Sequence, residues 1–177
     1  MAANDYNFLT TWRVQGTCEE VYEVLKDAPD LVRWWPAVYL DVKEEAAGDA
    51  EGVGKVVSLH TKGWLPYRLK WKFRVTRVTR PSGFALSAWG DFVGEGVWTF
   101  TQDGDWVKVQ YDWRIRADKP LLQRFSFIMK PVFAGNHRWA MARGEESLKL
   151  ELARRHARSL EERAAVAPPP GQRKGRR

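Results

Sequence analysis

The feature that most restricts the fold of this chain is a strict alternation of apolar and polar residues in two segments. Between residues 106 and 116, one face carries Val107, Val109, Tyr111, Trp113 and Ile115. Between residues 67 and 75, one face carries Leu69, Trp71, Phe73 and Val75, with Arg or Lys at the positions between them. Period-two alternation is typical of strands whose two faces differ in polarity. We therefore predict an antiparallel sheet with one buried and one solvated face.

Five other segments have weaker strand patterns, and most of them are bounded by turn-forming Gly, Pro or Asp residues. These segments cover residues 8–14, 38–45, 55–61, 83–90 and 94–102. In the last of them Trp98 and Phe100 share one face while Val97 lies opposite, which leaves the register open. The expected sheet has seven strands.

Two short helices are expected after the first strand. Thr17-Cys18-Glu19-Glu20 matches a capping box, in which the Thr17 side chain and the Glu20 side chain satisfy each other's backbone amides. A second short helical turn is expected from Pro29 to Trp34, because proline suits the first position of a helix.

A long helix is expected past Pro131, ending at about residue 163. One of its faces recurs at three- and four-residue steps and consists of His137, Ala140, Met141, Gly144, Leu148 and Leu152. Because glycine weakens a helix interior, we expect Gly144 to lie close to a bulky group, either a ring such as Trp113 or a ligand. Residues 1–163 then form a single domain, and residues 164–177, rich in Pro, Gly and Arg, form a disordered basic tail.

Composition and charge exclude several classes of protein. The single cysteine, Cys18, allows no intrachain disulfide, and the first residues resemble no signal peptide. No apolar run approaches the length that spans a bilayer, so we expect a cytoplasmic protein. The net charge of +7 includes four basic residues near the end of the chain; without them 25 basic residues face 22 acidic ones. A body charge near +3 argues against specific nucleic-acid binding.

Familiar catalytic and metal-binding patterns are missing. The three histidines have no metal-ligand spacing, and the chain contains no Cys-x-x-Cys, phosphate-binding loop or nucleophile elbow. We expect neither a metal nor a cofactor. The remaining unusual feature is the tryptophan content, ten in 177 residues. Each such ring buries about 150–250 Å², so the core is unusually aromatic or some of the rings line a space.

Three stretches give the chain a family resemblance: DLVRWWPAVYLDVK (residues 30–43), GDFVGEGVWTF (residues 90–100) and NHRWAMARGEESLK (residues 136–149). Together with the element order, they resemble the START-like (helix-grip) superfamily in its polyketide cyclase/dehydrase-like branch. The resemblance implies an α+β fold. In this fold a seven-stranded curved antiparallel sheet wraps around a long C-terminal helix, with two short helices between the first and second strands. It also implies a cavity between sheet and helix.

The candidate site follows from the faces that meet in such a fold. Small-molecule sites are mostly apolar with a few placed polar groups. The expected ligand-binding residues are Trp71, Trp98, Trp113, Tyr111, His137 and Met141. His137 is also a candidate general acid or base, since an unperturbed imidazole titrates near neutrality. Its alternative role is a helix-start residue bonded to a backbone carbonyl or water.

Three hypotheses about function remain open. The first is binding of a small hydrophobic or aromatic molecule, lipid- or polyketide-like, in the internal cavity. The second is a cyclase, dehydrase or isomerase acting on such a molecule. The third is a protein-interaction module, which would require a filled cavity. The apolar stretch from Phe125 to Gly135 suits core packing, a lid or a peripheral membrane contact through Phe125–Phe133. The oligomeric state is left open.

Overall fold

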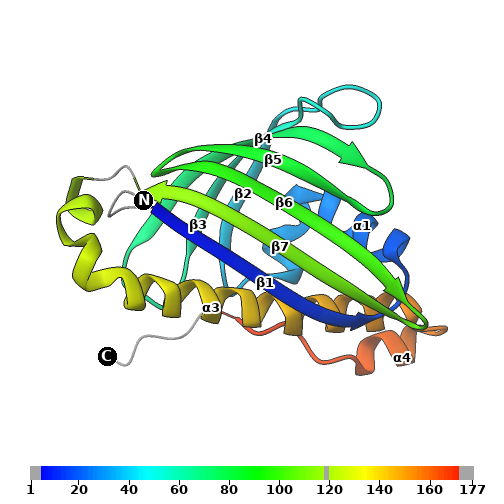
Figure 1. Cartoon of the computed structure of the whole chain (residues 1–177). Helices are drawn as coiled ribbons and strands as arrows, with labels where there is room; N and C mark the ends of the chain where they lie inside the picture. Colours follow the sequence, from blue (N-terminus) through cyan, green and yellow to red (C-terminus); the bar gives the residue numbers. More distant parts are fainter. Residues whose placement is uncertain (1–4, 118–119, 172–177) are drawn as a thin grey trace.

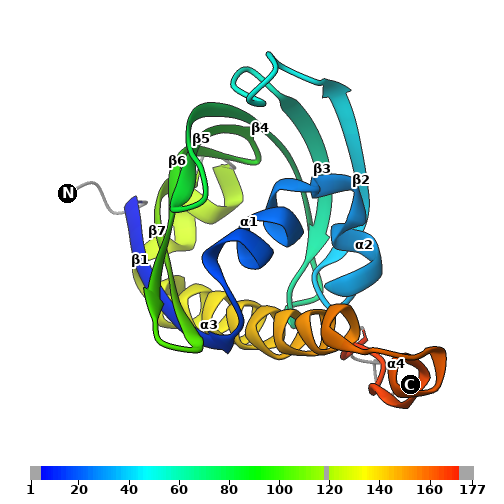
Figure 2. The same cartoon turned by 90° about the vertical axis from the view of Figure 1, so that its right-hand side faces the viewer.

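Seven antiparallel strands form one sheet that curls around the long helix α3 (Figures 1 and 2). The computed structural model describes residues 5–117 and 120–171, with side chains except at residues 117–129. The strands are β1 (Asp5–Gln15), β2 (Tyr39–Ala46), β3 (Val56–Lys62), β4 (Arg68–Thr79), β5 (Gly83–Gly90), β6 (Phe92–Asp103) and β7 (Trp106–Ala117). Their order is β1-β7-β6-β5-β4-β3-β2, so the first strand pairs with the last. The predicted α+β class and the seven-stranded curved sheet are confirmed.

The alternating pattern determines which face of the sheet is concave and buried. In β7 the side chains of Val107, Val109, Tyr111 and Trp113 are buried, as predicted from their period of two. In β6 the buried face carries Trp98 and Phe100, which resolves the register that the sequence left open. In β4 a bulge between Val75 and Arg77 shifts the pairing with β5.

Helices α1 (Cys18–Lys26) and α2 (Leu31–Trp34), separated by a short 3₁₀ turn, lie between β1 and β2. The capping box is present: Glu20 N donates to Thr17 Oγ1 at 3.2 Å, and Thr17 N donates to Glu20 Oε2 at 2.8 Å. Figure 2 shows α1 and α3 on the concave side of the sheet. The two predicted short helices are therefore confirmed.

The long helix α3 spans Pro120–His156 and is followed by α4 (Leu160–Ala165). The prediction of one helix from Pro131 to about residue 163 was wrong at both ends. Pro131 lies inside α3, where proline forgoes one backbone hydrogen bond without ending the helix. Near the other end, Ser159 is in an extended conformation and its side chain accepts from Glu162 N at 3.0 Å, so a new helix starts there.

The predicted apolar face of α3 packs against the sheet and the short helices. Met141, Leu148 and Leu152 are buried in the core. The bulky neighbour of Gly144 is neither Trp113 nor a ligand but Trp35: a Cβ added at Gly144 would lie 2.6 Å from Trp35 Cε2. Trp35 follows α2 and is held between Trp34 and Trp12, so it cannot move aside easily. Glycine at 144 therefore permits the closest approach of α3 to α2.

An ion pair between the half-exposed Arg33 and a buried carboxylate connects α2 to the same helix. Glu151 is buried on α3 and accepts from Arg33 Nη1 at 2.9 Å and from Arg33 Nη2 at 2.8 Å. Arg33 and Arg155 lower the pKa of the Glu151 carboxyl against the opposing effect of burial. Because a buried charge without its partner is costly, this bidentate pair fixes α2 against α3.

The domain boundary at residue 163 stays a prediction, although α4 crosses it and Arg154 Nη2 donates to the carbonyl of Ala167. Residues 172–177 of the predicted tail lie outside the described residues. In the described part of the chain, no helix combines the length and apolar content needed to cross a bilayer.

The contact between Gly144 and Trp35 predicts opposite effects for one substitution at two positions of α3. Gly144→Ala should lower the free energy of unfolding by about 1–2 kcal/mol, because overpacking in a rigid core outweighs the gain in helix propensity. Gly135→Ala should be neutral or stabilise by up to about 1 kcal/mol, since its Cβ would meet only Arg138 Nη2 at 3.9 Å. Urea denaturation of both variants checks this. Equal effects at the two positions would contradict the role of Trp35.

Candidate functional site

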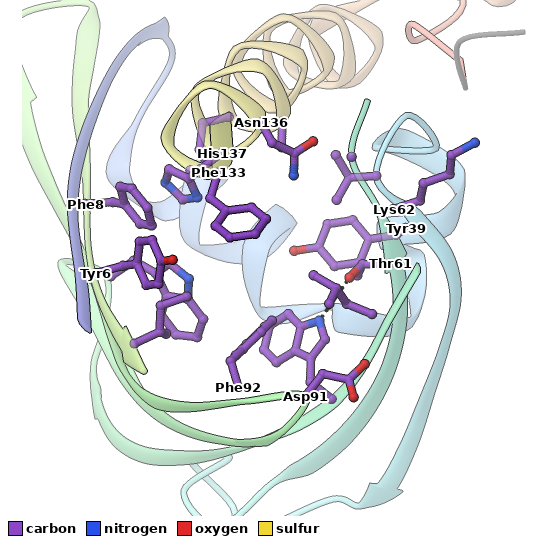
Figure 3. A pocket seen from close by; sticks show the side chains of 18 of the residues that line it. Tyr6, Phe8, Tyr39, Thr61, Lys62, Asp91, Phe92, Phe133, Asn136 and His137 are labelled. Carbon is purple, nitrogen blue, oxygen red and sulfur yellow. Dashed lines mark hydrogen bonds between the residues drawn. The ribbon is translucent and has the colours of Figure 1, made fainter. Parts of the chain in front are cut away.

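A cavity of about 170 Å³ lies between the concave face of the sheet and α3 (Figure 3). Its walls are mainly aromatic, and the rings come from strands far apart in the sequence as well as from α3. The aromatic lining residues are Tyr6, Phe8, Trp35, Tyr39, Tyr67, Trp71, Phe92, Tyr111, Trp113 and Phe133. Such a lining is typical of a site for a small apolar molecule.

The sheet side of the cavity is a continuous layer of rings. Tyr111 and Trp113 on β7 stack with their centroids 5.5 Å apart and 20° between their planes. Trp71 of β4 lies 5.8 Å from Trp113 and 4.9 Å from Phe92. Trp71 Nε1 donates to Thr61 Oγ1 at 3.1 Å, which fixes the orientation of that ring. The strand periodicity places these side chains on one face, and the curvature brings the strands together around the cavity.

The inner end of the cavity is closed where α3 approaches Trp35. Tyr39, the first residue of β2, stands edge-to-face against Trp35 at 5.2 Å between centroids. Met141 and Ala140 of α3 also line the cavity. The contact at Gly144 therefore determines how far the cavity extends along the helix.

The outer end is formed by α3, β1 and the loop between β3 and β4. Phe133 packs edge-to-face on both Tyr6, at 6.0 Å, and Tyr67, at 6.2 Å. Asn136 Oδ1 accepts from the backbone amides of Trp64 at 2.9 Å and Leu65 at 3.2 Å. Asn136 thus attaches the β3–β4 loop to the helix beside the cavity.

Tyrosine hydroxyls are the main polar groups of the cavity. Four of the five tyrosines of the chain line it: Tyr6, Tyr39, Tyr67 and Tyr111. Burial raises the pKa of Tyr111 well above its ordinary value, and it also raises the pKa of Tyr39. Burial and the neighbouring Tyr6 raise the pKa of Tyr67 to about 12. All three hydroxyls therefore keep their protons at neutral pH and can donate hydrogen bonds.

His137 lies at the edge of the cavity, against β1. Its ring stacks on Phe8 at 4.2 Å and 15° (Figure 3). Its Nε2 lies 3.5 Å from Thr10 Oγ1. Burial, with a smaller contribution from Arg138, lowers the pKa of His137 to about 4. The imidazole is therefore neutral at pH 7. An efficient general base has a pKa near the working pH, and the pKa of His137 lies well below it.

The charged lining residues are directed elsewhere. Figure 3 shows the amine of Lys62 pointing away from the cavity. The carboxylate of Asp91 accepts from Lys70 N at 2.8 Å, and Asp91 N donates to Lys70 O at 3.1 Å, as expected for a turn residue. Within residues 5–117 and 120–171, no three His, Cys, Asp or Glu side chains come together in a way that could hold a metal ion.

Five of the six predicted ligand-binding residues line this cavity: Trp71, Tyr111, Trp113, His137 and Met141. Trp98 does not. It faces inward as expected, but it lies behind Tyr111, stacked on that ring at 4.0 Å and 15°, and only 8% of it is exposed. The role of the six predicted residues in ligand binding stays a prediction.

Sequence reasoning missed most of the polar lining. Tyr39 lies at the start of a strand, Tyr67 lies in a loop, and Asn136 lies at a helix position, and none of them belongs to a periodic pattern. Tyr6 could have been found, because it extends the alternation of Phe8, Thr10 and Trp12 by one step.

In the stretch 125–133 with the predicted membrane contact, the side chains of residues 125–129 lie outside the described residues, and Phe133 lines the cavity. That contact stays a prediction.

The low pKa of His137 predicts a specific dependence of stability on pH. The unfolded chain takes up a proton near pH 6.5, whereas the folded chain does so only near pH 4. The free energy of unfolding should therefore fall as the pH drops from 6.5 to 4, by at most about 3 kcal/mol from this group. Above pH 6.5 the group contributes no pH dependence.

His137→Gln should remove that part of the loss, so urea denaturation at pH 7.5 and pH 4.5 should show a smaller difference in the variant than in the wild type. His156, which bonds Glu20 at 2.8 Å outside the cavity, provides the control substitution His156→Gln. An equal pH difference in the wild type and His137→Gln would show that His137 is not protected from protonation by burial.

Comparison with known proteins connects this architecture to a family. A family model described as polyketide cyclase/dehydrase and lipid transport matches residues 14–142, which is most of the chain. A search of curated proteins found no match.

Solved structures resemble the whole fold at low sequence identity. The ZhuI aromatase/cyclase of Streptomyces sp. R1128 is 18% identical with a TM-score of 0.67, covering 87% of this chain and 97% of that chain. A START superfamily protein of Mycobacterium smegmatis is 14% identical with a TM-score of 0.60, covering 76% and 93%. Norcoclaurine synthase of Thalictrum flavum, in complex with dopamine and hydroxybenzaldehyde, is 12% identical with a TM-score of 0.58, covering 88% and 90%. These likenesses support the helix-grip architecture, and the match to the family model identifies the chain as a member of the polyketide cyclase/dehydrase and lipid transport family.

Proposed function

We propose that this protein binds a small hydrophobic, aromatic molecule in the cavity between the sheet and α3. The observation that carries the proposal is an unfilled, aromatic-lined space of about 170 Å³. An apolar cavity of about 150 Å³ holds benzene. The space therefore suits one ring or two fused rings, and a longer molecule extends through the outer end.

The shape of the walls favours a flat ligand over a flexible chain. Trp71, Trp113 and Phe92 present ring faces and edges to the same space, and aromatic pairs gain energy in stacked or edge-to-face arrangements. Relatives of the same fold support this preference. One is an aromatase/cyclase and another is a synthase in complex with dopamine and hydroxybenzaldehyde. A polyketide-like aromatic ligand fits this site better than an acyl lipid.

The two alternative functions receive less support. A cyclase, dehydrase or isomerase needs a group that moves protons near the working pH, and the pKa of His137, about 4, suits that role poorly. The interaction-module hypothesis requires a filled cavity, whereas the space between sheet and helix is open. Binding without an assigned reaction is the function that the site supports best.

Blocking the cavity tests the proposal directly. Ala140 lines the cavity, and Ala142 is exposed on the same helix. Ala140→Phe should abolish binding of naphthalene-sized aromatic probes, because the new ring occupies their place. Ala142→Phe should leave binding unchanged. Calorimetric titration of the wild type should give dissociation constants in the micromolar range, about −8 kcal/mol. Saturable binding that survives Ala140→Phe would place the ligand elsewhere and refute the proposal.

Intrinsic fluorescence provides an independent measurement of the same site. A bound aromatic probe should change the tryptophan emission, and Trp113→Phe should reduce that change because Trp113 lines the cavity. Trp89, 37% exposed and absent from the cavity lining, supplies the matched control Trp89→Phe, which should leave the change intact. An equal loss of signal in both variants would contradict contact between the ligand and Trp113.

A further inference from the structure

We propose that the inner end of the cavity binds a neutral oxygen atom of the ligand, such as a ketone, phenol or ether oxygen, through the paired hydroxyls of Tyr39 and Tyr111. This inference rests on the proposed function and specifies the chemical class of ligand and the direction in which it enters. The oxygen points inward, toward Trp35, and the apolar rings lie between the sheet and α3.

The position of the Tyr111 hydroxyl is fixed by its surroundings. The Tyr111 ring is held between Trp98, at 4.0 Å, and Trp113, at 5.5 Å, in a nearly parallel stack. Its hydroxyl lies over Gly96 of β6, where a Cβ would approach Tyr111 Oη to 2.7 Å. Glycine at 96 therefore leaves room for this hydroxyl on the concave surface of the sheet.

Tyr39 brings the second hydroxyl into the cavity from a different strand, β2. Its ring stands edge-to-face on Trp35, and Figure 3 shows its hydroxyl directed into the cavity. Burial, with a smaller contribution from Tyr39, raises the pKa of Tyr111, which agrees with both phenols lining the same cavity. A ligand oxygen between them would meet donors from two different strands, β2 and β7.

Both hydroxyls have capacity for a ligand. Within the described residues, neither Tyr39 nor Tyr111 forms a side-chain hydrogen bond, while both line the cavity. A tyrosine hydroxyl can donate one hydrogen bond and also accept. Because the raised pKa values keep both phenols protonated, each can donate to an acceptor atom of a ligand in the cavity.

The charge around this end favours a neutral acceptor over a carboxylate. Among the described lining residues, the cationic side chain is that of Lys62, and its amine points away from the cavity. Lys130 lies at the outer end, with Nζ 5.8 Å from the centre of the Tyr6 ring. A carboxylate at the inner end would be buried without a counter-ion, which is strongly unfavourable. An anionic group is compatible only with the outer end.

Two nearly isosteric probes test the inference: 2-acetylnaphthalene, which carries a carbonyl oxygen, and 2-isopropylnaphthalene, which carries a methyl group in its place. Isothermal titration calorimetry on the full chain gives the ratio of their affinities. Tyr39→Phe and Tyr111→Phe should each lower the affinity for the ketone about three- to tenfold, as expected for one lost hydrogen bond. The affinity for the hydrocarbon should not change. Two variants are used so that the test survives if one of them fails to fold.

Tyr22→Phe is the matched control, because Tyr22 is the one tyrosine of the chain that does not line this cavity; it packs on Phe84 from α1. It should leave both affinities unchanged. The carboxylate analogue 2-naphthoate should bind at least about tenfold more weakly than the ketone, since its charge would be buried unpaired.

The possible results separate this inference from the proposed function. If both naphthalenes bind and neither phenylalanine variant changes their ratio, the inference is wrong and the binding function stands. An equal loss for ketone and hydrocarbon would show that the tyrosines act by packing alone, which also overturns it. Tight binding of 2-naphthoate that depends on Tyr39 would overturn the preference for a neutral oxygen. If the wild type binds none of the probes, the proposed function fails and the inference fails with it.

Discussion

The contact between Gly144 and Trp35 is the constraint on which the rest of the structure depends. It brings α3 against the indole ring that follows α2, and it closes the inner end of the space between the helix and the sheet. Trp35 in turn supports Tyr39 and packs on Trp12 and Trp34. The cavity therefore ends where α3 is held close to Trp35. The ion pair of Arg33 with the buried Glu151 secures the same junction about two turns further along α3.

The large tryptophan content serves two different purposes in the molecule. Trp12, Trp34 and Trp35 are almost fully buried around the short helices, where they fill the wide space that a strongly curved sheet leaves. Trp71 and Trp113 cover the sheet beside the open cavity, and Trp35 belongs to both groups because it also lines the cavity. Large rigid rings suit both tasks, because each buries much area while losing little conformational freedom. Aromatic composition alone could not separate the two groups. Trp12, Trp71 and Trp113 all occupy the inward positions of their strands, and Trp34 and Trp35 lie together at the end of a short helix.

The strands and their faces could be predicted from the sequence, because a period of two specifies which side chains share a surface. The cavity lining on β4 and β7 followed from that period, whereas the face of α3 that carries Met141 followed from its steps of three and four residues. The sequence pattern could not show that Trp98 lies behind Tyr111, because depth depends on how neighbouring strands stack their rings. Nor could it predict Tyr39 and Asn136, whose roles depend on contacts between segments far apart in the chain. Pro131 misled the helix prediction because a proline signal describes local geometry, whereas the surrounding fold decides whether a helix continues through it.

The amide side chain of Asn136 has a kinetic consequence. Its oxygen accepts from two successive backbone amides of the β3–β4 loop, so both of these hydrogen bonds between loop and helix depend on one acceptor atom beside the outer end of the cavity. Two hydrogen bonds that share one atom break together, which makes release of the loop a cooperative local event. A molecule too large to pass the outer end must wait for that event both to enter and to leave. Its residence time is then governed by the opening of the loop, while its equilibrium affinity is governed by the rings and hydroxyls inside.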